Sequence, residues 1–254
     1  MLPYPMHTTS PSSPRSPRRN AGTWKLDSNP AVANDPAMLR KALFSPNPHR
    51  RKRIVEFCDK YDPNIGVRWY ELLERGMRTK KDAKEFTAIQ DEAPDFLAPY
   101  VELSHSALAN GDHEEAFSIA SFAYVLAVQR IADRNGDWPE IMQWAWFENR
   151  PLMRALHHYA WLLWKFGQSE HAAMILRRIL RMNPGDNQGI RYELLAIRLG
   201  LSHETWDDPF FVKEGPMAGQ AWDAANISAW FEREAKKFPE EFNWMFAEWK
   251  KRRF

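Results

Sequence analysis

Cysteine is nearly absent from this sequence, because Cys58 is the only one in 254 residues. A disulfide framework needs pairs of cysteines, so a disulfide-stabilised secreted fold is excluded and a reducing compartment is expected. Long apolar runs are missing too, and none reaches the roughly 20 residues that a membrane-spanning helix requires. The sequence therefore predicts a cytoplasmic protein with no membrane partner.

Excess charge and the short motifs of catalytic or metal sites are also missing. The formal net charge is +2, so the charge of the whole chain gives no case for nucleic acid as a partner. The glycines at 185–189 lack the lysine and the preceding strand of a phosphate-binding loop. No histidine pair stands at metal-ligand spacing, and the adjacency of Ser104 and His105 does not make a nucleophile–base pair. We therefore expect no enzymatic activity, no cofactor and no metal.

What the chain does contain is a strong helical pattern over residues 149–192. Pro151 suits the first turn of a helix, and the apolar residues that follow recur at three- and four-residue spacing on one face. Gly167 interrupts the pattern, which then resumes until Pro184 and the glycine after it. The stretch predicts two antiparallel helices joined by a glycine turn.

This helical pair resembles a tetratricopeptide repeat (TPR), a helix–turn–helix unit of 34 residues. With Met153 as the first residue, the characteristic positions are filled by Ala160 and Ala172 (small), Gly167 (turn), Pro184 (closing) and Tyr159, Leu163, Leu176 and Ile179 (apolar). Leu156 departs from the pattern, because the family prefers Trp there. The resemblance, which includes bacterial TPR-containing proteins of unassigned role, implies an all-α superhelix of stacked helical hairpins.

The 34-residue register assigns further units along the chain. We expect a TPR-like domain over residues 38–206, with units near 63–96, 97–130, 153–186 and 187–206. The second helix of the 97–130 unit is predicted to continue through Ile131. An insertion at 131–152 then interrupts the register. Its aromatic residues, Trp138, Trp144, Trp146 and Phe147, either form a ledge on which a ligand stacks or fill the gap between adjacent units.

The two ends of the chain differ from the middle. Residues 1–37 are rich in Pro, Ser and Arg, and this composition predicts a disordered arm. The basic cluster Arg50–Arg53 is predicted to run into a short helix at 54–58. Residues 207–254 predict an aromatic helical cap, since a terminal unit would otherwise expose its apolar face. The cap helices are expected at 220–237 and from Pro239 onward.

The TPR resemblance implies a protein–protein interaction adaptor or scaffold, because the first helices of TPR units line a groove that holds peptides. Carried over by position, the peptide-binding residues are Arg154, His157, Trp161, Trp164, Gln188, Arg191 and Arg198, with Val101, His105 and Leu108 in the preceding unit. Arginine binds carboxylates through two parallel hydrogen bonds, so the expected ligand is an acidic segment or a C-terminal carboxylate. The opposing interpretation is that Glu148, Glu170 or Glu193 neutralises these arginines. If the groove interpretation holds, R154E with R191E abolishes binding and leaves the melting temperature unchanged.

Two other functions stay open at this point. A nucleic-acid-associated protein would use the basic clusters Arg15–Arg19, Arg50–Arg53 and Lys250–Arg253, and its affinity would fall steeply with salt. A self-assembling subunit would instead use the Trp-rich face between copies. The dipeptides Asn149-Arg150 and Asn187-Gln188 also predict a hydrogen-bonded brace between units, because they flank the same helical pair.

Overall fold

The computed structural model describes residues 53–76, 79–214 and 216–252, and this part of the chain is all-α, as the sequence predicts. The α-helices are α3 (Pro63–Arg75), α4 (Lys80–Glu92), α5 (Ala98–Ala109), α6 (His113–Ile131), α7 (Arg150–Lys165), α8 (Ser169–Met182), α9 (Ile190–Arg198), α10 (Ala224–Glu234) and α11 (Pro239–Arg252). Short 3-10 helices occupy Phe147–Asn149, Asp208–Phe210 and Ala235–Lys237. Within these residues, strand-like pairing is limited to two isolated bridges.

Local sequence determines where the helices of the first pair begin and end. The Asp62 side chain caps α3, and Gly76 ends it in the left-handed region at φ 74°. Thr79 and Asp82 then form a reciprocal capping box at the start of α4. The Lys81-Asp82 sequence therefore belongs to the first turn of a helix and not to the turn between helices.

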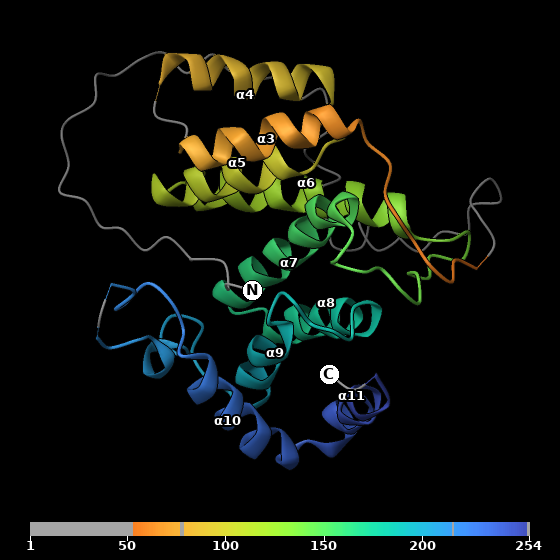
Figure 1. Cartoon of the computed structure of the whole chain (residues 1–254), viewed down its shortest axis with the longest axis vertical. Helices are drawn as coiled ribbons and strands as arrows, with labels where there is room; N and C mark the ends of the chain where they lie inside the picture. The colour runs from red at the N-terminus through yellow and green to blue at the C-terminus, as the bar shows by residue number, and fades with distance from the viewer. Residues whose placement is uncertain (1–52, 77–78, 215, 253–254) are drawn as a thin grey trace.

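In each of the next two helical pairs, a left-handed glycine lies between the two helices. Gly111 between α5 and α6 has φ 81°, and Gly167 between α7 and α8 has φ 82°, a region that side chains with a Cβ rarely adopt. The helix pair predicted within 149–192 and the continuation of α6 to Ile131 are confirmed. In Figure 1, α3 to α6 lie side by side in layers, and α7 and α8 cross beneath them.

The apolar side chains are buried in two clusters of unequal size. The larger cluster runs from α5 to α11, and α7 contributes Leu152, Leu156 and Leu162 as fully buried residues. The smaller cluster joins α3 to α4 and contains Ile65, Trp69, Leu72, Ile89, Phe96 and Ala98. Burying one such leucine contributes about 1.5–3 kcal/mol, so the larger cluster provides most of the stability.

Residues 53–62 are extended, so the short helix predicted at 54–58 is wrong. The backbone of this segment pairs with the insertion: Ile141 N donates to Val55 O and Phe57 N donates to Ile141 O, both at 2.9 Å. A short apolar run fits a strand or a helix equally well by periodicity. The insertion decides between them, because it supplies hydrogen-bond partners that the backbone would otherwise lack.

The insertion fills a gap, and it also leaves one aromatic ring on the surface. Met142 and Asn149 are fully buried, and Met142 N donates to the carbonyl of Met182 at the end of α8. Phe147, in contrast, is 57% exposed. The buried residues of the insertion thus fill a gap, and a ligand-stacking role for Phe147 stays a prediction.

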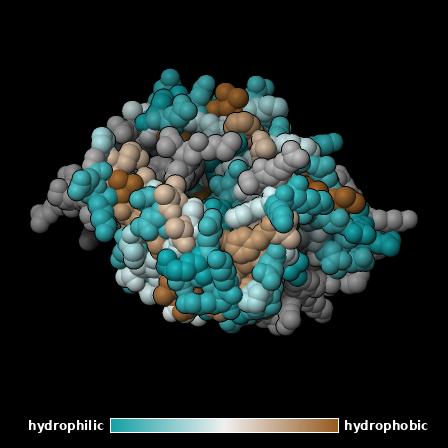
Figure 2. Space-filling model, turned by 60° about the horizontal axis from the view of Figure 1, so that its bottom comes forward, coloured by the Kyte–Doolittle hydropathy of each residue, from teal (hydrophilic) through white to brown (hydrophobic). Residues whose placement is uncertain are grey.

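The C-terminal residues pack against α8 and α9. Helix α10 begins at Ala224 instead of the predicted 220, because the Asp223 side chain caps it there. Helix α11 begins at Pro239, as predicted, and the Trp249 indole donates to Pro184 O at 2.7 Å. Hydrophilic residues predominate on this end of the molecule, with apolar residues in small scattered groups (Figure 2).

Several sequence predictions concern residues that lie outside the described part of the chain, namely the arm at 1–37 and the basic residues Arg50, Arg51 and Lys52. Across the described ranges, no helix has both the length and the apolar character needed to cross a membrane.

Candidate functional site

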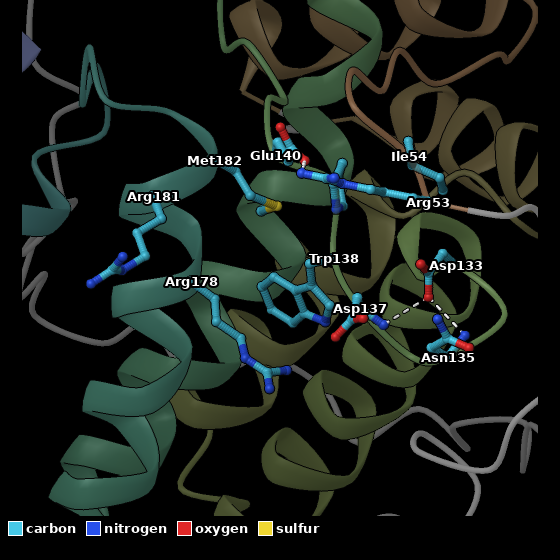
Figure 3. Close-up of a pocket in the computed structure, with 11 residues that line it drawn as sticks. Arg53, Ile54, Asp133, Asn135, Asp137, Trp138, Glu140, Arg178, Arg181 and Met182 are labelled. Atoms are coloured by element: carbon cyan, nitrogen blue, oxygen red, sulfur yellow. Dashed lines mark hydrogen bonds and ion pairs between the residues drawn. The ribbon is translucent and has the colours of Figure 1, made fainter.

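A cavity of about 460 Å³ lies between the insertion and α8 (Figure 3). Several of its charged side chains make contacts within the fold. The guanidinium of Arg178 lies 5.3 Å from the centroid of the Trp138 ring, and Arg53 forms an ion pair with Glu140. The Asp133 carboxylate accepts two backbone N–H bonds from its own loop, at 2.7 and 3.0 Å. These contacts give the residues a structural role.

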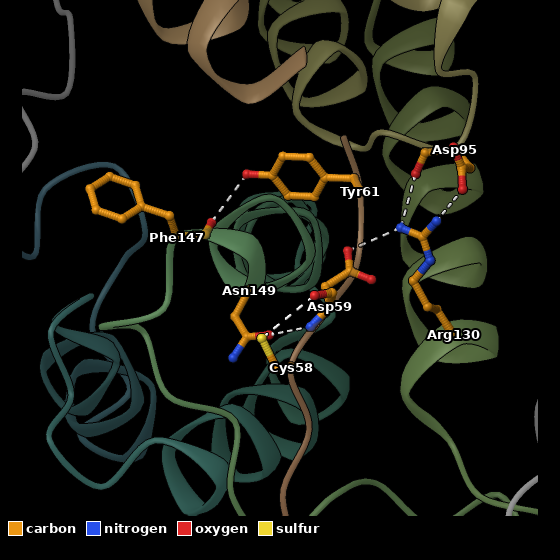
Figure 4. A network of polar contacts seen from close by, with 7 residues as sticks. All are labelled: Cys58, Asp59, Tyr61, Asp95, Arg130, Phe147 and Asn149. Atoms are coloured by element: carbon orange, nitrogen blue, oxygen red, sulfur yellow. Dashed lines mark hydrogen bonds and ion pairs between the residues drawn. The ribbon is translucent and has the colours of Figure 1, made fainter. Parts of the chain in front are cut away.

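A polar network around Asp59 includes Tyr61 and Phe147, which line a second, larger hollow (Figure 4). Asp59 forms an ion pair of 3.1 Å with Arg130, which also pairs with Asp95. Burial raises the pKa of Asp59, although the charge of Arg130 opposes this shift. The Tyr61 hydroxyl then donates to Phe147 O at 3.4 Å. The network thus places Tyr61 and Phe147 at one edge of the hollow.

The Asn149 side chain bonds to the extended segment and to the insertion, and not to Asn187 or Gln188 as the predicted brace between units requires. Its Oδ1 accepts the N–H of Asp59 at 2.9 Å, and its Nδ2 donates to the carbonyls of Phe57 at 3.2 Å and Gln143 at 3.0 Å. It therefore holds the extended segment and the insertion against the start of α7. Gln188 makes a separate contact, with its Nε2 3.5 Å from Met153 O.

The larger hollow is a groove of about 960 Å³ between α3, α5 and α7, the first helices of the three pairs. It is lined by aromatic and apolar side chains, four glutamates and two arginines. Val67 on α3 and Phe147 before α7 are each 57% exposed, the highest values among the large apolar side chains of the described residues. We call this hollow the α3–α5–α7 groove.

Aromatic rings contact the guanidinium groups of both arginines that line the α3–α5–α7 groove. The Arg150 guanidinium lies 3.9 Å from the centroid of Phe147 and 5.4 Å from that of Trp144. Arg154 lies 5.5 Å from the ring centroids of Tyr70 and Trp144. Tyr70 and Phe147 meet edge to face at 6.3 Å. Such cation–π contacts each contribute about 0.5–2 kcal/mol and hold the guanidinium groups in place.

The remaining surface of the groove is acidic. Glu71 and Glu74 on α3 are exposed, and within the described ranges neither they nor Glu148 belongs to an ion pair.

Gly66 lets the Tyr61 ring pack against α3 at the edge of the groove, because a Cβ at Gly66 would lie 2.8 Å from Tyr61 Cε2. The groove thus combines apolar and aromatic contacts with both signs of charge.

Of the seven predicted peptide-binding residues, only Arg154 lines the α3–α5–α7 groove. His157, one turn further along α7, lies 2.8 Å from Glu193 Oε2 on α9. Burial alone would lower the pKa of His157, but the charge and hydrogen bond of Glu193 outweigh it, and the net effect is a raised pKa. His157 is therefore engaged with one of the glutamates that the opposing interpretation named.

The two predicted tryptophans of α7 pack against the loop that follows α9. Trp161 lies 4.4 Å from the His203 ring, centroid to centroid. Trp164 is only 4% exposed and contacts His203 at 5.1 Å and Trp206 at 6.0 Å. The expectation that Trp164 is exposed in a groove is wrong, because a loop absent from a regular repeat covers it.

Arg191 and Arg198 of α9 are paired with carboxylates, though not with the predicted ones. Arg191 Nη1 lies 2.8 Å from Asp186 Oδ2, and its guanidinium lies 5.2 Å from the Trp249 centroid. Arg198 Nη2 lies 2.9 Å from Glu240 Oε1 on α11. The C-terminal helices therefore cover the donor surface expected on α9.

The matching positions of α5 are also occupied by contacts within the fold. Val101 is buried and Leu108 packs against the larger core cluster. The His105 and His158 rings meet edge to face at 4.3 Å. His158 Nε2 lies 2.8 Å from Ser104 Oγ, a spacing that resembles a base next to a nucleophile. However, Ser104 is fully buried and its hydroxyl donates to Ala116 O, so this pair holds helices together.

Sequence reasoning missed most of the residues that line the groove. Val67, Tyr70, Glu71 and Glu74 share one face of α3 by their three- and four-residue spacing, opposite the buried face that contains Trp69. This exposed face of α3 could have been predicted from the sequence. The position of Phe147 in the groove could not, since it depends on how the insertion folds.

Comparisons with known proteins add no family or relative. No family model matches the sequence, and no curated protein or solved structure is significantly similar to it. Among the described residues, no three His, Cys, Asp or Glu side chains gather in a way that could hold a metal ion.

Proposed function

We propose that this protein is a non-catalytic interaction module that binds an extended peptide of a partner protein in the α3–α5–α7 groove. The observation that carries the proposal is the exposure of Val67 and Phe147, each 57%, in the lining of a hollow that also contains two positioned arginines. Apolar side chains that stay accessible beside rigid aromatic rings are typical of peptide-docking surfaces.

The proposal includes a TPR-like arrangement of the three helical pairs. Two features support it: the glycine turns at Gly111 and Gly167, and the lining of the groove by the first helix of each pair. A peptide in this groove would contact α3, α5 and α7 at once. The described part of the chain thus offers a binding surface that no single helical pair could form.

Selection of peptides from a random library on the full-length protein tests this function. Phe147→Ala combined with Val67→Ser is expected to weaken binding of the selected peptides at least tenfold, because both side chains would contribute buried apolar area. The matched control is Met174→Ser on α8, which removes a side chain of similar exposure (51%) outside the groove. Equal binding by the groove variant and the control would refute the proposal.

A further inference from the structure

Glutamates outnumber arginines among the residues that line the groove. Four glutamates line it against two arginines. The arginines are held on aromatic rings, and Arg150 Nε also donates to Trp144 O at 3.1 Å. Glu71 and Glu74, in contrast, face solvent one helical turn apart and lack ion pairs with described residues. A peptide that suits this surface carries positive charge.

The chain itself contains a segment of that kind. Residues 1–52 hold 9 Lys and Arg against 2 Asp and Glu, whereas residues 53–254 hold 26 against 31. The near-neutral total therefore hides two parts of opposite charge, +7 and −5. One basic stretch of this part, PSSPRSPRRNAGTWK at 11–25, has three arginines, one lysine and one tryptophan and no acidic residue.

The covalent connection allows this stretch to reach the groove. The extended residues 53–62 end at the groove edge, where Tyr61 and Pro63 line it. Ten extended residues span at most about 36 Å, and the 27 residues between Lys25 and Arg53 can span about 90 Å. Chain length therefore does not limit the contact, and attachment makes binding intramolecular.

We propose that the basic stretch at 11–25 occupies the α3–α5–α7 groove of its own chain when no partner is bound. This inference rests on the peptide-binding function proposed above. The arginines of the stretch pair with Glu71 and Glu74, and its apolar side chains contact Val67 and Phe147. A partner peptide then has to displace the stretch, which makes the contact autoinhibitory.

The test uses the full chain and a labelled synthetic peptide with the sequence of residues 11–25. If the chain's own stretch acts at an effective concentration of about 1 mM against an intrinsic Kd of about 100 µM, it weakens binding of the added peptide about tenfold. The variant R15Q R18Q R19Q should therefore bind the peptide about tenfold more tightly than the wild type. The matched control, R40Q K41Q K52Q, removes three positive charges elsewhere in the same segment and should behave like the wild type.

A second pair of variants tests the groove side of the contact. In the R15Q R18Q R19Q background, Glu71→Gln with Glu74→Gln should lower affinity for the peptide. Glu114→Gln with Glu115→Gln, at the exposed start of α6, should not lower it.

Equal affinity of the wild type and R15Q R18Q R19Q would overturn the inference, and so would the absence of binding to every variant. In either case, library-selected peptides that still depend on Phe147 and Val67 would leave the proposed function intact.

Discussion

Two surfaces of this protein, the one on α9 and the α3–α5–α7 groove, look alike in sequence and differ in the structure. Both carry arginines next to aromatic residues. On α9, Arg191 and Arg198 pair with Asp186 and Glu240 and lie under the C-terminal helices. In the α3–α5–α7 groove, the arginines rest on aromatic rings and the surface stays open. The comparison shows that a donor-rich helix face identifies a binding surface only when no later part of the chain covers it.

The covering segment has a clear physical origin. Between α9 and α10, the described residues contain only the short 3-10 helix Asp208–Phe210, and Trp206 and Phe210 enter the larger core. Helices α10 and α11 follow and bring Glu240 and Glu241 against α8 and α9. Near α3, the described residues provide no comparable cover.

The largest expected loss of stability follows substitution of Asp186, on the α9 surface that the C-terminal helices cover. This fully buried carboxylate accepts the N–H of Ile190 at 2.8 Å and of Arg191 at 3.1 Å, in addition to its ion pair with the Arg191 side chain. Asp186→Ala should therefore reduce the free energy of unfolding by about 3–5 kcal/mol, measured by urea denaturation. A loss below about 1 kcal/mol would contradict a structural role for this contact.

The same contact reverses the sequence-based expectation that R154E with R191E leaves the melting temperature unchanged. Arg191→Glu would place two carboxylates together at a buried position, so it should lower the melting temperature rather than leave it unchanged. Arg154→Glu changes a residue of the open groove and should cost much less. Separate thermal scans of the two single variants measure the difference.

A smaller effect is expected where α11 contacts α8. Glu241 is largely buried, and both of its carboxylate oxygens accept from Arg177 Nε at 2.8 Å. Glu241→Ala should cost about 2 kcal/mol, because it leaves the arginine without its partner. Glu240→Ala serves as the control. It removes an exposed carboxylate and should cost less than about 1 kcal/mol.

Two adjacent histidines should respond to pH in opposite directions. Glu193 raises the pKa of His157, so the stabilisation from this pair is present below about pH 6.5 and is lost as pH rises through the raised value. Burial lowers the pKa of His158, so its contribution is present above about pH 6.5 and is lost as pH falls.

Melting temperatures of the wild type, His157→Gln and His158→Gln between pH 5 and 9 check these directions. The difference between wild type and His157→Gln should shrink toward pH 9. The difference between wild type and His158→Gln should shrink toward pH 5. The same trend in both variants would show that the contacts of one histidine are wrong.

The smallest effect on stability is expected in the open groove. Val67→Ser removes an exposed side chain and should change the free energy of unfolding by less than about 0.5 kcal/mol. Phe147→Ala also removes the ring that contacts the Arg150 guanidinium, so it should cost about 0.5–1 kcal/mol. Urea denaturation measures this. A loss above about 1.5 kcal/mol would mean that these residues serve packing and not binding.

The sequence predicts the helices better than it predicts their surroundings. Periodic apolar residues and the turn at Gly167 define α7 and α8, and Pro239 fixes the start of α11. Burial of Trp164 and pairing of Arg198 depend on residues more than 30 positions away, so no local pattern contains them. The extended form of 53–62 likewise depends on pairing with Ile141.

Hydrogen–deuterium exchange of the full-length R15Q R18Q R19Q variant, whose groove is expected to be free, with and without a library-selected peptide, is the most direct test of the central claim. If the α3–α5–α7 groove is the binding surface, the peptide should slow exchange at the amides of α3 and the first turns of α7, and leave α9 and α11 unchanged. Slower exchange confined to α9, the loop around Trp206 or α11 would contradict the account, because it would place the binding surface where the structure is closed.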